Sequence, residues 1–160
     1  MHPNAQLIEK FYTAFQSHDG DGMAACYHPD VTFTDPAFGI LHSTRATSMW
    51  RMLVGRSKDL QVTFNNIQAD DNRGSAHWEA KYSFGPKRRS VHNIIEAEFV
   101  FKDGLIYQHT DRFNFWRWSS MALGVTGILL GWTPMIQSAV RKNALGGLEK
   151  FMEKLSTPTG

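Results

Sequence analysis

Apolar residues recur at two spacings along this chain, helical near its start and alternating in much of the remainder. Residues 4–17 begin with Asn4, a residue type common at helix N-caps, and carry five large apolar side chains on one helical face. A further helix is expected over residues 44–54, ending at Gly55. The apolar stripe of the first helix consists of Leu7, Ile8, Phe11, Tyr12 and Phe15. Between the two helices, residues 31–35 alternate as a strand does.

Four longer strand-like segments follow the helices. They cover residues 60–69, 75–84, 91–102 and 105–116, and glycine-rich or charged turns separate them. Such turns join neighbouring strands into antiparallel hairpins. Helices followed by a run of hairpins predict the α+β class, with a curved antiparallel sheet wrapped around the N-terminal helices.

Side-chain alternation assigns the two faces of these strands. One face gathers aromatic residues with a few polar groups, and the other carries histidine, glutamate and lysine. An aromatic face with converging polar groups is typical of a small-molecule pocket. A packed core with a few hydrogen-bonded polar residues is the alternative. The residues expected to bind a ligand are Tyr12, Phe15, Phe33, Trp50, Trp78, Tyr82, Asn93, Phe99 and Phe113.

Three polar residues share strand faces with apolar neighbours. Asp35 alternates with Val31 and Phe33, whereas His109 and Asp111 fall on one face with residues 105, 107 and 113. A carboxylate there costs free energy unless it has a partner or a function. Apolar surroundings raise its proton affinity, which suits proton transfer beside a carbonyl group. Asp35, His109 and Asp111 are therefore the candidate catalytic residues. Turn capping by Asp35 and a structural His109–Asp111 pair are the alternatives.

The C-terminal part differs in composition. Residues 119–140 contain no charged side chain, and three glycines leave one helical face nearly bare. Thr133 and Pro134 predict the start of a new helix. We expect a domain over residues 1–118 and a helical extension over 119–160 that packs on that domain or forms a dimer contact. The interrupted apolar run disfavours a membrane span. Contact of residues 119–140 with a membrane surface stays open as a less favoured alternative.

Composition narrows the functional class. The 160 residues suit one domain, and a net charge of +2 gives no signal for nucleic-acid binding. His77, His92 and His109 fall on different strands and mixed faces, so no metal site is expected. Cys26 stands alone, which excludes an intrachain disulfide and fits a reducing compartment. No signal-peptide pattern opens the chain, and we expect a cytoplasmic location.

Several segments resemble the nuclear transport factor 2-like superfamily, near its ketosteroid isomerases and SnoaL-like polyketide cyclases. The resemblance is carried by residues 19–23, 27–36, 99–106 and 109–111, and it covers about residues 5–116. It implies a cone-shaped α+β barrel with a deep apolar pocket and frequent dimers. This fold hosts many chemistries and some proteins without catalytic activity.

The resemblance assigns roles residue by residue. Asp35 corresponds to the general base of the isomerases, and Asp111 to the acid position of the cyclase branch. The two oxyanion donors of the isomerases fall on Phe11 and Ala97, so the resemblance does not extend to ketosteroid isomerase activity. An epoxide-opening variant needs an arginine between two acids. Arg112 does not suit that arrangement, because side-chain alternation puts it on the strand face opposite Asp111.

Together these observations predict cofactor-free acid–base chemistry of the isomerase, cyclase or dehydratase type. The expected substrate is a small apolar cyclic carbonyl or enol compound, and a homodimer is expected. The alternative is a non-catalytic module of the same fold that binds a small molecule or mediates dimerisation.

Overall fold

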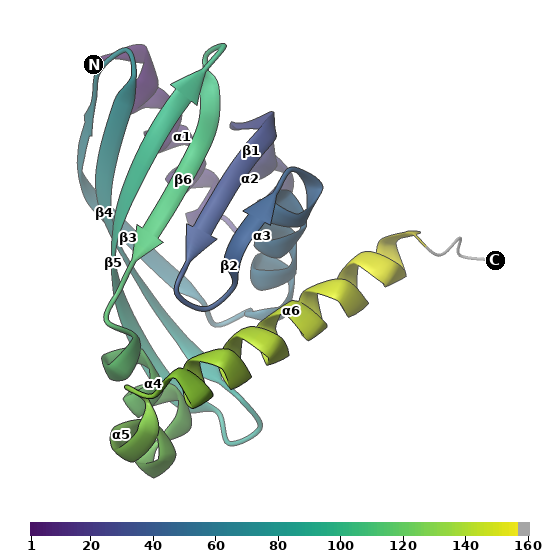
Figure 1. Ribbon diagram of the computed structural model, residues 1–160. Helices are drawn as coiled ribbons and strands as arrows, with labels where there is room; N and C mark the ends of the chain where they lie inside the picture. Colours follow the sequence, from purple (N-terminus) through teal and green to yellow (C-terminus); the bar gives the residue numbers. More distant parts are fainter. Residues whose placement is uncertain (157–160) are drawn as a thin grey trace.

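A curved six-stranded sheet forms the frame of the molecule (Figure 1). The computed structural model describes residues 1–156 of the 160. The strands lie in the order β2-β1-β6-β5-β4-β3, so the sheet is open at both edges. They are β1 (Tyr27–Asp35), β2 (Gly39–His42), β3 (Gln61–Ala69), β4 (Arg73–Phe84), β5 (Arg89–Lys102) and β6 (Leu105–Arg112).

Three N-terminal helices cover one face of this sheet (Figure 1). They are α1 (Pro3–Gln16), α2 (Gly20–Ala24) and α3 (Thr44–Arg56). The apolar stripe of α1 is buried against the strands, with Ile8 and Phe11 fully inaccessible. The structure thus confirms the α+β cone, in which the inner face of the sheet wraps around the helices.

Strand pairing agrees with the expected meander and adds one feature. β3, β4, β5 and β6 pair in antiparallel hairpins, as the turns predict. The sheet is nevertheless mixed, because β1 pairs with β6 in parallel and with the short β2 in antiparallel orientation. β2 was not expected from the sequence, since four residues are too few to show a clear alternation.

A β-bulge in β6 corrects one expected face. Val100 pairs with Gln108 while Phe101 pairs with Ile106, so Tyr107 is an extra residue in the ladder. The bulge reverses the alternation, and Ile106 is buried in place of residues 105 and 107. The expectation that Leu105 and Tyr107 share the inner face was therefore wrong. His109 and Asp111 lie beyond the bulge and remain inside.

The C-terminal part forms three helices: α4 (Phe115–Leu123), α5 (Val125–Leu130) and α6 (Pro134–Ser156). α6 crosses the open end of the sheet and then extends away from the body (Figure 1). It packs against α3, and its Leu148 is fully buried in the main core. The expected start of this helix is confirmed, because the Ile136 amide donates to Thr133 Oγ1. Within residues 1–156 no helix combines the length and apolar character required to cross a membrane.

Candidate active site

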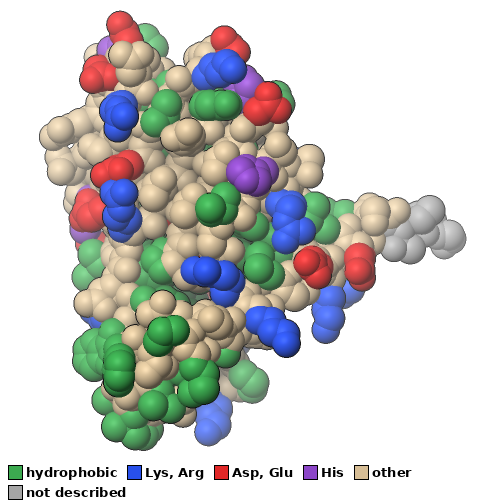
Figure 2. Space-filling view, in the orientation of Figure 1, with side chains coloured by type: hydrophobic (Ala, Val, Ile, Leu, Met, Phe, Trp, Pro, Cys, Tyr) green, Lys and Arg blue, Asp and Glu red, His purple; other side chains and the backbone are tan. Residues whose placement is uncertain are grey.

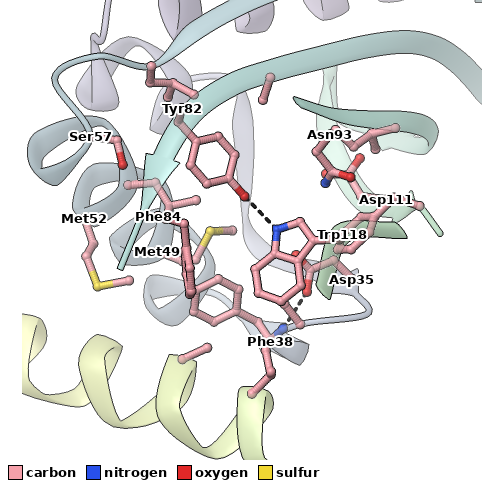
Figure 3. Close-up of a pocket in the computed structure, with 18 of the residues that line it drawn as sticks. Asp35, Phe38, Met49, Met52, Ser57, Tyr82, Phe84, Asn93, Asp111 and Trp118 are labelled. Carbon is pink, nitrogen blue, oxygen red and sulfur yellow. Dashed lines mark hydrogen bonds between the residues drawn. The ribbon is translucent and has the colours of Figure 1, made fainter. Parts of the chain in front are cut away.

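A cavity of about 680 Å³ lies between the sheet and the helices α3, α4 and α6. Its walls are mainly apolar, and aromatic side chains from the strands and from α4 face it (Figure 3). Ile136, Val140 and Ala144 of α6 lie four residues apart on one helical face and close one side. The volume falls within the range of small-molecule sites in proteins.

The cavity takes up only part of the predicted inner face. Phe15, Trp50, Trp78, Tyr82, Asn93 and Phe113 line it, as do Asp35 and Asp111. Tyr12, Phe33 and Phe99, which were also expected to bind a ligand, do not line this cavity. These three side chains are nearly inaccessible and pack among other rings, because the helices fill the narrow end of the cone.

Asp35 ends β1 and combines two of the roles weighed for it. Its Oδ1 accepts a hydrogen bond of 2.6 Å from the Phe38 amide, so it caps the following turn. It also lines the cavity (Figure 3). Burial, with a smaller contribution from the charge of Asp111, raises the pKa of Asp35 to about 7, although the Phe38 amide and Arg141 act in the opposite direction. At neutral pH this carboxyl group exchanges readily between its two protonation states.

Asp111 is buried and held by two donors. Its Oδ1 accepts from His109 Nε2 at 2.8 Å and from Trp78 Nε1 at 3.2 Å. Two N–H donors suit a carboxylate, which only accepts hydrogen bonds. Within residues 1–156 no protein group bonds to Oδ2, so this oxygen is available to a ligand. Asp35 and Asp111 thus face one cavity in different environments.

His109 lies behind the cavity instead of lining it. Its side chain is completely inaccessible, and its Nδ1 is 2.7 Å from the Tyr27 hydroxyl oxygen. That oxygen accepts from Trp50 Nε1 at 2.7 Å, and among the described residues His109 Nδ1 is the acceptor within reach of the Tyr27 hydroxyl hydrogen, to which we assign this bond. Nδ1 is then the acceptor of the ring, and Nε2 carries the hydrogen that is donated to Asp111. Burial keeps the pKa of Tyr27 well above its usual value, consistent with a protonated donor.

Tyr27 was missed in the sequence analysis, although a signal for it exists. Extending the alternation of Val31 and Phe33 backwards places Tyr27 on the same face, but Pro29 obscured the early start of β1. Trp118 was also missed, because the last strand was expected to run to residue 116. Asn114 is the signal there: its side chain accepts from the Arg117 amide and caps α4.

Two further polar groups face the cavity from the sheet. Trp118 Nε1 donates to the Tyr82 hydroxyl oxygen at 2.8 Å, which leaves the Tyr82 hydrogen free for a ligand oxygen (Figure 3). Burial raises the pKa of Tyr82 to about 12, so this group is a neutral donor. Asn93 is buried and lines the same cavity. These two side chains can orient a carbonyl or hydroxyl group.

Other polar residues singled out in the sequence lie elsewhere. Arg112 is exposed and 2.7 Å from Glu98 Oε1, so it does not stand beside Asp111 in the cavity. His77 and His92 both bond to Glu79 on the outer face of the sheet, opposite His109. Within residues 1–156 no group of histidine, cysteine and acidic side chains is arranged to hold a metal ion.

Comparison with known proteins identifies the family. The SnoaL-like domain profile matches residues 8–109, well over half of the chain, and the chain belongs to this family. No curated protein matches the sequence.

Solved structures share the fold at low identity. An epoxide hydrolase of M. tuberculosis, described as LEH-like, is 22% identical with a TM-score of 0.64, over 79% of this chain and 95% of that one. A putative polyketide cyclase from Xanthomonas campestris pv. campestris is 20% identical with a TM-score of 0.62, over 74% and 96%. TsrD from Streptomyces laurentii is 20% identical with a TM-score of 0.64, over 76% and 95%. At these identities the likeness establishes the fold alone.

Proposed function

We propose that this protein catalyses cofactor-free acid–base chemistry on a small apolar cyclic carbonyl or enol compound, as an isomerase, cyclase or dehydratase. The proposal is carried by one observation: Asp35 and Asp111 both line a single, largely apolar cavity and lie in different electrostatic environments. Two carboxyl groups held in different protonation states provide an acid and a base at the same pH.

The geometry suggests a role for each group. Asp111 Oδ2 accepts the proton from the carbon beside the carbonyl group, while His109 and Trp78 hold the other oxygen. Asp35 in its neutral form gives its proton to the carbonyl oxygen, so the C–H bond breaks and an enol forms without a free oxyanion. For an isomer, Asp111 gives its proton to another carbon while Asp35 takes back the enol proton as the carbonyl re-forms. For a cyclised product, the enol carbon instead bonds to a second carbonyl carbon of the ligand, whose C=O π bond opens as its oxygen takes the proton from Asp111, and Asp35 again recovers the enol proton. Tyr82 donates to a second oxygen of the ligand.

Two neighbour classes support this chemistry to different degrees. Polyketide cyclases and epoxide hydrolase-like proteins both occur among the structural neighbours, so the same fold is used by both classes. Epoxide opening by an acid–arginine–acid arrangement is less well supported here, because Arg112 pairs with Glu98 outside the cavity. The cyclase and isomerase type therefore fits the residues better.

Deuterium exchange tests the proposal on a panel of model compounds, since the substrate itself need not be identified. Apolar cyclic ketones are incubated with the protein in D₂O, and NMR follows deuterium incorporation beside the carbonyl group. We expect exchange with some members and a loss of about 10²-fold or more in Asp111→Asn and in Asp35→Asn. The matched control Asp30→Asn changes an exposed carboxylate on the same strand, β1, and should leave exchange unaltered. Equal exchange in the wild type and both cavity variants would refute the proposal.

A binding module is the second candidate, and the mainly apolar lining of the cavity favours it. In that case a ligand binds without exchange, and affinity persists in both asparagine variants. Calorimetry with the same panel separates the two cases. The homodimer stays a prediction, which light scattering of the purified chain would decide.

A further inference from the structure

Large apolar side chains crowd one end of the molecule, where α5 and its neighbours lie (Figures 1 and 2). We call this surface the apolar tip and define it by Trp116, Val125, Ile128, Leu129, Trp132 and Met135. Leu129 is 63% exposed and Trp132 is 68% exposed. Contiguous apolar side chains of this size on a surface indicate a contact with another apolar phase or molecule.

Close packing between α4 and α5 explains why the large residues face outward. A Cβ added at Gly127 would lie 1.9 Å from the Ser119 carbonyl oxygen, and one at Gly131 would lie 2.0 Å from Ser119 Oγ. The glycine face of α5 is therefore pressed against α4, and the opposite face with Ile128 and Leu129 is turned to solvent. Helix packing for stability alone normally buries the large apolar face. Here the arrangement is reversed.

The indole N–H groups of the two exposed tryptophans already have hydrogen-bond partners within the protein. Trp116 Nε1 donates to the Ile128 carbonyl oxygen and Trp132 Nε1 to the Leu129 carbonyl oxygen, both at 3.1 Å. Their polar N–H groups are thus already satisfied within the protein. Transfer of these rings out of water leaves no indole donor unpaired.

Basic residues accompany the apolar tip. No acidic residue occurs from residue 112 to residue 148, although two basic residues of this stretch lie elsewhere: Arg112 pairs with Glu98 and Arg141 donates to the Pro36 carbonyl oxygen. The turn with the exposed Lys87 and Arg88 adjoins the tip, because Arg89 Nε donates to the Met121 carbonyl oxygen beside the α4–α5 junction. Arg88 pairs with one carboxylate, Asp59, at 3.7 Å, so Lys87 and Arg89 add to the positive charge of this turn. The surroundings are therefore net positive.

We propose that the apolar tip docks on a membrane surface containing anionic phospholipids, with its side chains in the interfacial layer and the basic residues against the headgroups. Apolar and tryptophan side chains next to lysine and arginine match such an interface in both polarity and charge. A second copy of this chain fits less well, since two positive rims would be brought together. The proposal is independent of the catalytic one.

Vesicle flotation tests the docking with the full chain. The probes are vesicles of phosphatidylcholine alone and of an equal mixture with phosphatidylglycerol. We expect the wild type to float with the mixed vesicles and weakly with the neutral ones. Leu129→Asp should lower binding about tenfold or more, by placing a charge in the inserted face. Replacing Lys87 and Arg88 by glutamine should lower binding to the mixed vesicles roughly tenfold, because each basic residue near the surface contributes.

Ile40→Asp is the matched control. Ile40 is 64% exposed, as Leu129 is, but it lies on β2, and its substitution should leave flotation unchanged. Circular dichroism and light scattering of every variant report folding and oligomeric state. The proposal is overturned if the folded wild type floats with neither vesicle, or if Leu129→Asp and Ile40→Asp behave alike. It is also overturned if Leu129→Asp dissociates a dimer that binds no vesicles, which would make the tip an interface between copies.

Discussion

Replacing Asp35 by asparagine should change the pH dependence of stability in a defined direction. Burial raises the pKa of Asp35 from 3.8 to about 7 in the folded chain. Folded protein therefore binds more protons than unfolded protein between these two values, and stability falls as pH rises through this window. Below about pH 4 the shifted pKa of Asp35 has no effect on the free energy of unfolding, and above about pH 7 the whole loss of stability has occurred.

The size of this effect is set by the shift in pKa. At about 1.4 kcal/mol for each tenfold change in proton affinity, the raised pKa of Asp35 corresponds to a loss of up to about 4 kcal/mol above neutral pH. Asparagine has no charge to desolvate and keeps an oxygen for the Phe38 amide. The Asp35→Asn variant should therefore be more stable than the wild type by up to this amount at about pH 8, and nearly equal to it at about pH 4.

Urea denaturation followed by tryptophan fluorescence measures the difference at each pH. Subtracting the wild type from the variant removes the contribution of all other titrating groups, provided that they are unaffected. Asp30→Asn on the same strand is the control, since Asp30 is exposed, and its curve should parallel that of the wild type. A constant difference between Asp35→Asn and the wild type across this pH range would refute the assignment of a raised pKa to Asp35.

Three further substitutions test the packing and the hydrogen bonds. Gly127→Ala should destabilise the chain by about 1–3 kcal/mol in urea denaturation, because its Cβ meets the Ser119 carbonyl oxygen, whereas Gly146→Ala has open space and should not. Leu148→Ala should cost about 2–5 kcal/mol because the side chain is fully buried, in contrast to Leu155→Ala at 62% exposure; equal effects would contradict the docking of α6. Tyr27→Phe should cost about 1–3 kcal/mol for each group left unpaired and release the tautomer of His109, seen in ¹⁵N NMR spectra; an unchanged His109 spectrum would contradict the proposed hydrogen-bond chain.

The sequence predicted the fold because its signals are local. The periodicity in residues 4–17, the turns between the later strands and the alternation in residues 78–84 and 91–99 each depend on near neighbours. Even the inward position of Asp111 followed from alternation, since the bulge at Tyr107 lies before it. The bulge itself and the parallel pairing of β1 with β6 depend on distant strands and leave no local pattern.

The candidate site was predictable only in part, for the same reason. Asp35 and Asp111 stand out as acids on apolar faces, but the cavity between them is defined by residues of α6 more than twenty positions further along the chain. Alternation along the strands shows which side chains face inward, but it does not show how far along the cone each one lies. It therefore could not separate Tyr12, Phe33 and Phe99, which pack in the narrow end, from the residues that line the cavity. The hydrogen bond from Tyr27 to His109 joins residues 82 positions apart.

The wall that α6 supplies has a consequence for how this protein can diversify. The acid pair comes from the sheet, whereas Ile136, Val140 and Ala144 come from a single helix near the end of the chain. Substitution at these three positions can resize the cavity while Asp35 and Asp111 keep their hydrogen-bond partners. The size of the cavity is thus set largely by a different stretch of sequence from its two acids, and residues 136, 140 and 144 are the natural positions at which to alter that size without changing Arg141, which acts on Asp35.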